Sequence, residues 1–386
     1  MREFSVVTGG PLFRIYRRAR LSGEALQLVI RRVVCLAALV WIPLLVLSAL
    51  EGRAWGGTRE PFLMDLELHA RLLIALPLLV AGEPLIHRLM CIAVREFTER
   101  GLVPAASLVG FEAAVATASR LRDSWLAELV IALLVYVVGV GLVWHELIAP
   151  RIDTWYRGLP GGVPHVTLAG WWYGLVSLPL FQFILLRWYY RLGIWVWLLC
   201  RVVRNGLALV PTHPDRCGGL GFLGEFTWAL EPLLLAHGVL LAGVAASGIF
   251  FEERILTDYW PALLLLALLV FAIVLGPLLI FIPVLVRAKQ VGLSEYGALA
   301  QAYVRQFDTK WLRDVSPGKP LLGSADIQSL ADMGNSYAVI ADMRVLPVSR
   351  KAIVWLSLIT VAPIAPLLLT LVSIPEILQL VLKGLG

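Results

Sequence analysis

Charged residues are scarce in this sequence. Only 16% of its 386 residues are Asp, Glu, Lys or Arg, whereas 59% are hydrophobic and the mean hydropathy is +0.81. A soluble domain is typically about 25% charged and about 45–50% apolar. So few polar side chains could not cover a soluble protein of this length, which excludes a cytosolic enzyme and a disordered chain. The composition predicts a polytopic membrane protein.

Cysteine and catalytic signatures are also sparse. The four cysteines form no CxxC pair, which excludes a disulfide scaffold. The His145-Glu146 pair lacks the second histidine that a zinc protease would place four residues after the first. The chain contains no P-loop and no Gly-x-Ser-x-Gly elbow. No recognised signature therefore indicates an enzyme, and any cofactor or metal stays unassigned.

Long apolar stretches are abundant. A membrane-spanning helix needs about 20 mostly apolar residues, because hydrocarbon satisfies no open backbone group. The sequence predicts an all-α transmembrane bundle with seven such stretches. The last one contains Pro363 and Pro366 and is either a kinked span or a re-entrant pair. The predicted spans are 33–50, 66–92, 124–147, 168–199, 227–250, 260–286 and 352–372.

Basic residues predict the orientation of these spans. With the N-terminus inside, 26 of the 33 Lys and Arg residues lie on the cytoplasmic side and 7 on the other. This is a strong positive-inside signal, and no cleavage site follows the first apolar run. We expect a multi-pass protein of the bacterial inner membrane that contacts anionic headgroups on the cytoplasmic side. The basic residues are divided among juxtamembrane segments, which argues against nucleic acid as a partner.

The chain divides into three predicted parts. Residues 1–286 form a six-span membrane bundle with cytoplasmic loops at 93–123 and 200–226. Residues 287–351 form a cytoplasmic helical segment, and residues 352–386 form a C-terminal span or re-entrant hairpin.

The segment 287–351 contains an amphipathic pattern. Apolar residues recur at three- and four-residue steps, which predicts a basic amphipathic helix. It lies either along the inner membrane face or against other cytoplasmic helices. The polar residues of a second predicted helix form either a solvated face or a surface that meets a partner. The apolar residues are Leu293, Tyr296, Ala300, Tyr303, Phe307 and Trp311, and the polar ones are Gln328, Asp332, Asn335 and Asp342.

The loop 211–224 concentrates unusual residues between the fourth and fifth spans. It contains His213, Asp215 and Arg216, two prolines and four glycines. Its main-chain N–H groups could approach an anion, or His213 and Asp215 could share a metal. The alternative is a tight turn in which Asp215 satisfies loop amides. Its formal GxGxxG follows no predicted strand, so a dinucleotide site is not indicated.

Ionisable residues inside predicted spans are costly in lipid and suggest function. All of them fall in the cytoplasmic half, so we expect them to meet near the loop 211–224. They form either a binding site for a small solute or ion, or Glu–Arg pairs that hold helices together. The candidate residues are Glu83, His87, Glu128, Arg187, Arg191, His213, Asp215, Arg216, Glu231 and His237.

Glu83 and Glu231 each begin a Glu-Pro-Leu triplet. Proline at a first helical position needs no N–H partner, so each triplet could begin a half-helix within a broken span. Broken helices line the sites of many transporters.

Two strings of the sequence are distinctive together. They are His213-Pro-Asp-Arg-Cys-Gly-Gly-Leu-Gly-Phe-Leu-Gly224 and Leu321-Leu-Gly-Ser-Ala-Asp-Ile-Gln-Ser-Leu-Ala-Asp332, which continues to Asn335-Ser-Tyr337. They resemble a family of bacterial multi-pass inner-membrane proteins to which no activity is assigned. The resemblance implies an inner-membrane location and supplies no catalytic residue.

Three functional hypotheses follow from these patterns. The first is a transporter or channel for a small solute or ion, with Glu83, His87, Glu231 and His237 as its polar site. The second is a metal-dependent enzyme acting on a lipid phosphate, in which His213 and Asp215 join His87 or His237. The third is a non-catalytic assembly or signalling subunit with 287–351 as its partner surface. A homo-oligomer is compatible with each.

Overall fold

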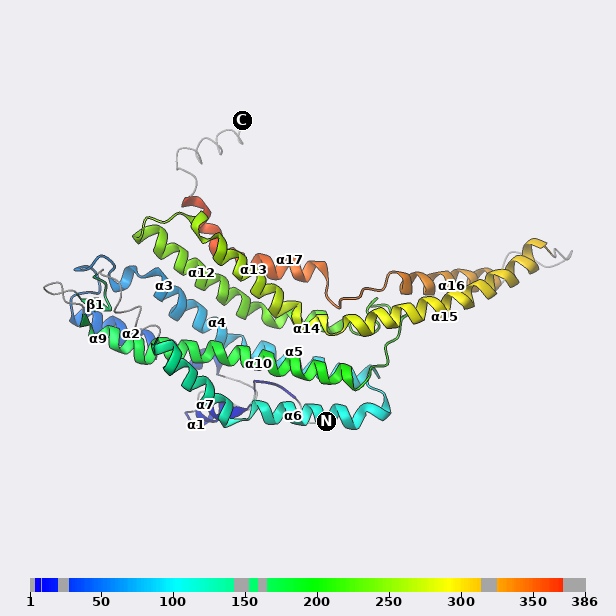
Figure 1. Cartoon of the computed structure of the whole chain (residues 1–386), viewed down its shortest axis with the longest axis horizontal. Coiled ribbons are helices and arrows are strands. Elements are labelled where there is room, and N and C mark those ends of the chain that lie inside the picture. Colours follow the sequence, from blue (N-terminus) through cyan, green and yellow to red (C-terminus); the bar gives the residue numbers. More distant parts are fainter. Residues whose placement is uncertain are drawn as a thin grey trace, which may run out of the picture.

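The structure is a computed structural model that describes residues 4–7, 9–19, 28–141, 153–158, 165–313 and 325–370. It is an all-α bundle of long, roughly parallel helices with one two-stranded antiparallel sheet at one end (Figure 1). This confirms the predicted polytopic helical fold. We call the end with β1 and β2 the strand end and the opposite end the arm end.

The elements follow in this order along the chain, where η marks a 3₁₀- or π-helical turn. The first half contains α1 (Gly10–Arg18), α2 (Val29–Leu50), η1 (Phe62–Met64), α3 (Leu66–His69), η2 (Ala70–Ala75), α4 (Leu76–Ala81), α5 (Glu83–Glu99), η3 (Ala105–Ser107), α6 (Leu108–Arg122), α7 (Trp125–Leu134), η4 (Val135–Val140), β1 (Arg157–Gly158), β2 (His165–Val166), α9 (Leu168–Trp172) and η6 (Tyr173–Ser177). The second half contains α10 (Leu178–Arg204), α11 (Phe222–Phe226), η7 (Thr227–Leu230), α12 (Glu231–Phe251), η8 (Leu256–Tyr259), α13 (Trp260–Val274), α14 (Gly276–Leu279), α15 (Ile282–Asp308), η9 (Thr309–Arg313), α16 (Ala325–Ala341), α17 (Arg350–Val361) and η10 (Ala362–Thr370).

Six helical stretches in the described residues are long and apolar enough to cross a membrane, namely Val29–Leu50, Leu66–Glu99, Leu168–Arg204, Phe222–Phe251, Leu256–Val274 and Arg350–Thr370. The protein is therefore an integral membrane protein. Of the predicted span 124–147, the structure describes the shorter apolar helix Trp125–Gly139. Residues 142–147 lie outside the described residues, as does the end of the predicted span 352–372.

The predicted span 260–286 differs from the structure. The candidate span ends at Val274, and two further helices begin at Gly276 and Ile282. Pro277 and Pro283 stand in the first turns of these helices, where the absent proline N–H needs no partner. The apolar run is thus divided, and α15 begins within the part of the chain that we assigned to the membrane.

Local sequence signals explain where several helices begin. The side chains of Ser124, Thr167 and Ser349 accept backbone N–H groups three residues later, at 2.9–3.3 Å. Asp65 does the same for Leu68 at 2.7 Å. Such N-caps satisfy amides that a helix start leaves open.

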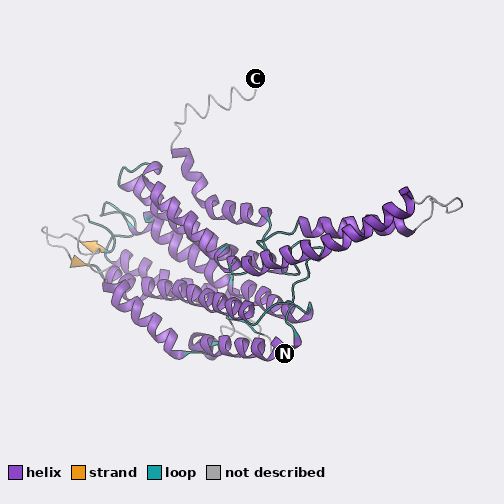
Figure 2. Cartoon of the chain, turned by 45° about the vertical axis from the view of Figure 1, so that its right-hand side comes forward, coloured by secondary structure: helices purple, strands orange, loops and turns teal. Residues whose placement is uncertain are grey.

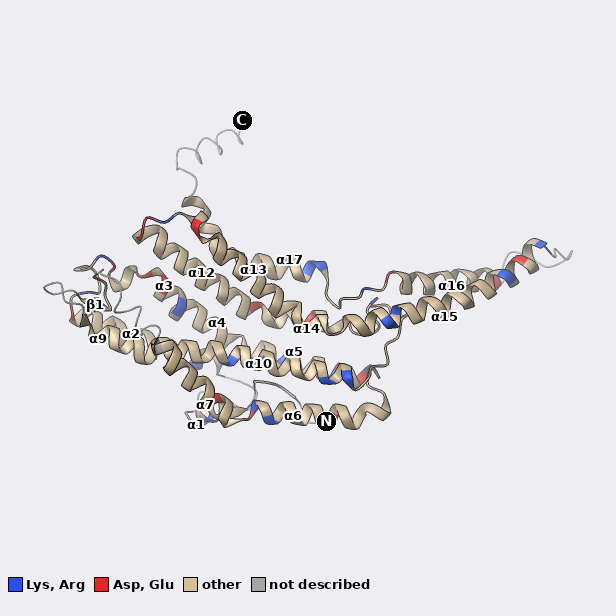
Figure 3. Cartoon of the chain, in the orientation of Figure 1, with Lys and Arg blue, Asp and Glu red and all other residues tan. Residues whose placement is uncertain are grey.

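Helices α10 and α12 form the centre of the bundle. Half of the apolar 18-residue core of the span containing α10, and 56% of that of the span containing α12, is buried, against 22% for the spans of α2 and α13. Figure 3 shows α12 and α13 free of charge along most of their length. Exposed Leu264, Leu265 and Phe271 give α13 an apolar outer face, as expected for a helix that contacts lipid.

Helices α15 and α16 form an antiparallel hairpin that extends well beyond the bundle (Figures 1 and 2). We call residues 282–313 and 325–341 the arm. The predicted apolar residues of α15 are half-buried and lie beside α16, and Tyr303 donates to the Asp326 carbonyl oxygen at 2.9 Å. Of the two alternatives for this amphipathic helix, the structure therefore favours packing against another helix, because α16 occupies its apolar face.

Candidate functional site

A helix break between α4 and α5 positions the central charged residue. Pro84 has no N–H, so the carbonyl of Val80, four residues earlier, loses its usual helical donor. Arg32 Nη2 donates to that carbonyl at 3.3 Å, and Trp188 Nε1 donates to the neighbouring Leu79 carbonyl at 3.1 Å. The Glu-Pro-Leu triplet thus begins a new helix at Glu83. Side chains of α2 and α10 donate to the backbone carbonyls at this break.

Glu83 lies at the centre of a buried ion cluster. Its carboxylate contacts Arg32 Nη1 at 3.0 Å, Arg191 Nη1 at 2.7 Å and Arg187 Nη1 at 3.7 Å. Arg187 Nε also contacts Glu128 Oε1 at 3.0 Å. Four helices, α2, α5, α7 and α10, therefore meet through these five side chains, which we call the ion cluster.

The ion cluster also holds the N-terminal segment. The Leu12 amide donates to Glu128 Oε2 at 2.8 Å, and Arg187 Nη2 donates to the Gly9 carbonyl at 3.2 Å. The Arg32 guanidinium lies over the Tyr16 ring, 5.3 Å from its centroid. The N-terminal segment therefore closes the cluster from one side.

The burial of the cluster determines what it can do. Arg32 is fully buried, and Glu83, Glu128, Arg187 and Arg191 are 3–8% exposed. Charges so far from water are tolerated only when they are paired, and removal of one partner is strongly destabilising. The arrangement is suited to holding the helices together, and it leaves Glu83 only 5% exposed to a solute.

Two candidate residues lie outside the ion cluster, on α12. Glu231 Oε1 accepts from Trp355 Nε1 of α17 at 2.8 Å. His237 contacts the Tyr189 hydroxyl through Nε2, and its Nδ1 lies 2.7 Å from the Leu233 carbonyl.

His87 is the remaining candidate in the spans. Its Nδ1 lies 3.8 Å from Cys91 Sγ, one turn further along α5. The structure thus distributes the candidate residues of the spans among separate contacts. Of these residues, only Glu83, Glu128, Arg187 and Arg191 meet in one cluster.

The loop 211–224 is a turn closed by its own aspartate. The Asp215 carboxylate accepts the amides of Cys217 at 2.8 Å, Gly219 at 3.1 Å and Gly221 at 2.8 Å. These hydrogen bonds, together with the nearby charge of His213, hold the pKa of the Asp215 carboxyl below its ordinary value despite its partial burial. The loop amides that we expected to approach an anion thus donate to the Asp215 carboxylate instead.

The same loop holds the base of the arm. The Arg344 amide donates to the Arg216 carbonyl at 2.7 Å, and Arg344 Nη2 donates to the Asp215 carbonyl at 3.1 Å. Arg216 Nη1 contacts Asp342 at 3.3 Å, and Lys289 donates to the Met343 carbonyl at 2.9 Å. His213, Asp215 and Arg216 therefore belong to a clamp that joins the arm to the bundle.

Few side chains of the described residues could act together as metal ligands. His213 Nδ1 and Asp215 Oδ1 lie 2.9 Å apart, but within the described ranges no three His, Cys, Asp or Glu side chains converge on one point. The histidines that the metal hypothesis adds, His87 and His237, have the separate contacts given above. The geometry lends this hypothesis no support.

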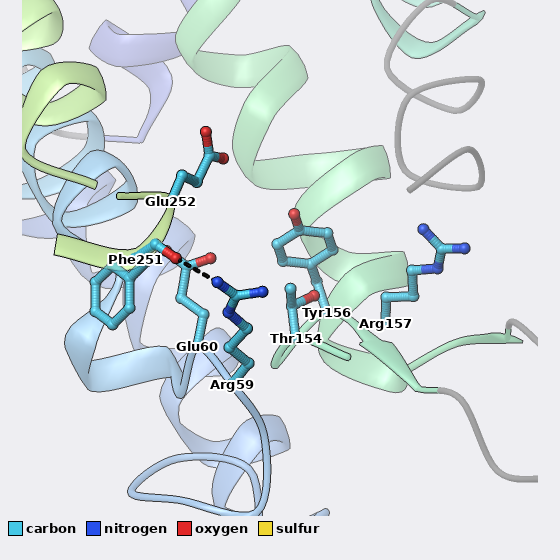
Figure 4. Close-up of a pocket in the computed structure, with 7 residues that line it drawn as sticks. All are labelled: Arg59, Glu60, Thr154, Tyr156, Arg157, Phe251 and Glu252. Carbon is cyan, nitrogen blue, oxygen red and sulfur yellow. Dashed lines mark hydrogen bonds between the residues drawn. The ribbon is translucent and has the colours of Figure 1, made fainter. Parts of the chain in front are cut away.

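Two features were missed by reasoning from the sequence. The first is Arg32, which directly precedes the predicted span 33–50 and is one of the basic residues that predict the orientation of the spans. The second feature is a cavity at the strand end, formed by three segments far apart in the chain (Figure 4). No sequence motif links those segments.

Comparison of the chain with protein-family models, with curated proteins and with solved structures found no match. The function is therefore argued from the geometry of this chain alone.

Proposed function

We propose that this protein is a non-catalytic assembly subunit of the membrane, and that its arm pairs with the arm of a second copy. The observation that carries the proposal is the arm itself. It extends beyond the bundle (Figure 2), and its base is held by the clamp at 211–224. A rigidly mounted helical hairpin is suited to presenting a surface to another protein chain.

The arm has apolar surface left over after α15 and α16 pack together. Leu299 and Leu312 are 53% and 69% exposed, and Ile327 on α16 is 43% exposed. In α15 and α16, only Leu285, Gly292 and Ile340 are buried. Two hairpins that pair can bury such residues together as a four-helix bundle.

The charges of the two helices favour a second copy as the occupant. Residues 282–313 contain five basic and two acidic residues, whereas α16 contains two acidic and no basic residues. Lys310 and Asp326 already pair within one hairpin. In a two-fold symmetric pair, α15 of each copy meets α16 of the other, so the same contact forms twice. Such pairing sets the remaining basic residues of α15 opposite the remaining carboxylate of α16, Asp332.

The positive-inside distribution of basic residues supports the orientation that goes with this proposal. It places the N-terminus and the arm in the cytoplasm of a bacterial cell and the strand end outside. The transport hypothesis requires water at Glu83, but the ion cluster buries that carboxylate, and Glu83 is only 5% exposed. We therefore do not propose transport through this group.

The oligomeric state of the purified full chain in detergent tests the proposal. Light scattering coupled to size-exclusion chromatography should give a dimer. Leu299→Glu or Ile327→Glu should shift it to monomer, because each places a carboxylate in the apolar interface. Gln301→Glu adds the same charge at an exposed position of α15, about 200° around the helix from Leu299, and should leave the dimer intact. A monomeric wild-type protein, or dimers that both arm variants retain, would refute the proposal.

A further inference from the structure

Helix α1 packs beside the first turns of α7 (Figure 1). The Gly10 amide donates to Oδ1 of Asp123, two residues before α7 begins, at 3.1 Å. The Leu12 amide donates to Oε2 of Glu128, in the first turn of α7, at 2.8 Å. These contacts place α1 at the same level along the bundle as the start of α7.

That level is the edge of a surface that faces lipid. Leu126, Leu129, Val130 and Leu133 of α7 are 52–61% exposed, and in a membrane protein such an apolar face is covered by hydrocarbon. Trp125, the first residue of α7, is 64% exposed. Tryptophan is enriched where hydrocarbon meets the headgroups. Helix α1 therefore lies at a membrane–water interface.

Helix α1 buries one face in the bundle and exposes another. Phe13 and Tyr16, three residues apart, are buried. Arg14, Arg17 and Arg18 are exposed and share a second face, which spans about 100° because successive residues are roughly 100° apart on a helix. The buried face holds α1 on the protein, so the basic face is fixed at the edge of the membrane.

The described residues supply no counter-charge for these three arginines. Helix α1 contains no acidic residue. The carboxylates that contact it, Asp123 and Glu128, form ion pairs with Arg122 and Arg187 instead. Since like charges one turn apart on a helix repel each other, an anion from outside the chain would stabilise this face.

We propose that the basic face of α1 binds the phosphate headgroups of anionic phospholipids. A guanidinium donates in a planar fork that matches the oxygens of a phosphate. Ile15, which is 58% exposed, contacts the acyl chains, while the long arginine side chains keep their charges at headgroup level. In the proposed orientation this leaflet is the cytoplasmic one, whose surface is negative. The expected contact with anionic headgroups is thereby assigned to one helix, and it does not depend on pairing of the arms.

The lipids retained by the purified full chain test this proposal. The protein is incubated in detergent with an equimolar mixture of phosphatidylglycerol and phosphatidylcholine, and native mass spectrometry counts the bound lipids. Wild type should retain more phosphatidylglycerol than phosphatidylcholine. The double variant Arg17→Gln, Arg18→Gln should lower this preference at least about fivefold, because each basic residue near the surface contributes to the attraction. Arg17→Lys, Arg18→Lys keeps the charges and should retain most of the preference.

Two arginines of α10 provide the matched control. Arg201 and Arg204 are exposed in the last turn of α10, as Arg17 and Arg18 are in the last turn of α1. Arg201→Gln, Arg204→Gln therefore removes the same charge and the same interaction with a helix dipole. Figure 1 shows this end of α10 well beyond the start of α7, toward the arm end. The control variant should leave the lipid preference unchanged.

Three results would overturn the proposal. The first is equal retention of both lipids by wild type. The second is a preference that the double variant of α1 keeps in full. The third is an equal loss in the variants of α1 and α10, since net charge alone would then explain the preference. The same spectra report the oligomeric state, so failure of this proposal is distinguishable from failure of the pairing of the arms.

Discussion

Gly82 and Pro232 are in direct contact, and through them the two Glu-Pro-Leu triplets of the chain pack against each other. A Cβ atom on Gly82 would lie only 2.7 Å from Cβ of Pro232. The starts of α5 and α12, each with proline in its first turn, therefore lie side by side in the bundle. Their glutamates nevertheless reach different partners, since Glu83 enters the ion cluster and Glu231 contacts Trp355.

Gly82→Ala should destabilise the protein. Alanine usually stabilises a helix by about 1 kcal/mol relative to glycine, but here the added methyl group meets a rigid proline ring. Overpacking of this kind costs about 1–3 kcal/mol, so the clash should prevail and the thermal midpoint in detergent should fall. Gly193→Ala in α10 is the matched control, because nothing lies within 4 Å of its added Cβ. A midpoint that rises equally in both variants would show that the triplets are not in contact.

Glu83→Gln should destabilise the protein by about 3–5 kcal/mol, the range for breaking a buried ion pair. The change leaves Glu128 as the remaining carboxylate of the ion cluster, and its ion pair is with Arg187. Glu99→Gln provides the control, since its pair with Arg95 is more than half exposed, and such pairs contribute about 0–1 kcal/mol. Equilibrium unfolding of the two variants measures the difference, and equal effects would contradict a structural role for the cluster.

Asp215→Asn should loosen the clamp at the base of the arm. An amide side chain turns one acceptor oxygen into a donor, which then faces a backbone N–H of Cys217, Gly219 or Gly221. Loss of a hydrogen bond to a charged group costs about 1.5–3 kcal/mol. Glu112→Gln, at an exposed position of α6, should change stability by less than about 0.5 kcal/mol. Denaturant unfolding compares the two, and an unaffected Asp215→Asn protein would contradict the clamp.

The pH dependence of the Asp215 variant has a definite sign. The pKa of the carboxyl is lowered in the folded protein, so its contribution to stability is fully present above the ordinary value of 3.8. It disappears as the pH falls below that value toward the folded pKa. The difference between wild type and Asp215→Asn should therefore shrink in acid, and a constant difference would argue against the three amide contacts.

Arg32 and Arg191 show how far reasoning from the sequence could go. The cost of a charge in hydrocarbon marked Glu83, Glu128, Arg187 and Arg191 as residues that need partners, and four of the five cluster members were predicted as candidates. Arg32 was not among the predicted candidates, because a basic residue at the start of an apolar run is also typical of a topology signal. Which arginine pairs with which glutamate depends on how α2, α5, α7 and α10 pack, and no spacing along the chain contains that information.

The loop 211–224 illustrates a second limit. Its glycines and its aspartate predicted both a tight turn and an open anion site, since both need the same residue types. The backbone conformation decides between them, with Gly218 and Gly219 at φ of 64° and 97°, because it directs the amides inward to the Asp215 carboxylate.

Hydropathy and charge along the sequence were sufficient to establish a helical membrane protein and most of its spans, and the two Glu-Pro-Leu triplets indicated where α5 and α12 begin. Lipid and proline act locally on the residues that meet them, so these features can be found from the sequence. Three-dimensional packing settled the rest. It packed α16 against the apolar face of α15, buried Glu83 among arginines and brought Glu60, Thr154 and Glu252 to the lining of one cavity. Those outcomes arise from contacts between segments up to about 190 residues apart, such as Arg59 with Phe251, and local physical chemistry does not specify which distant segments will meet.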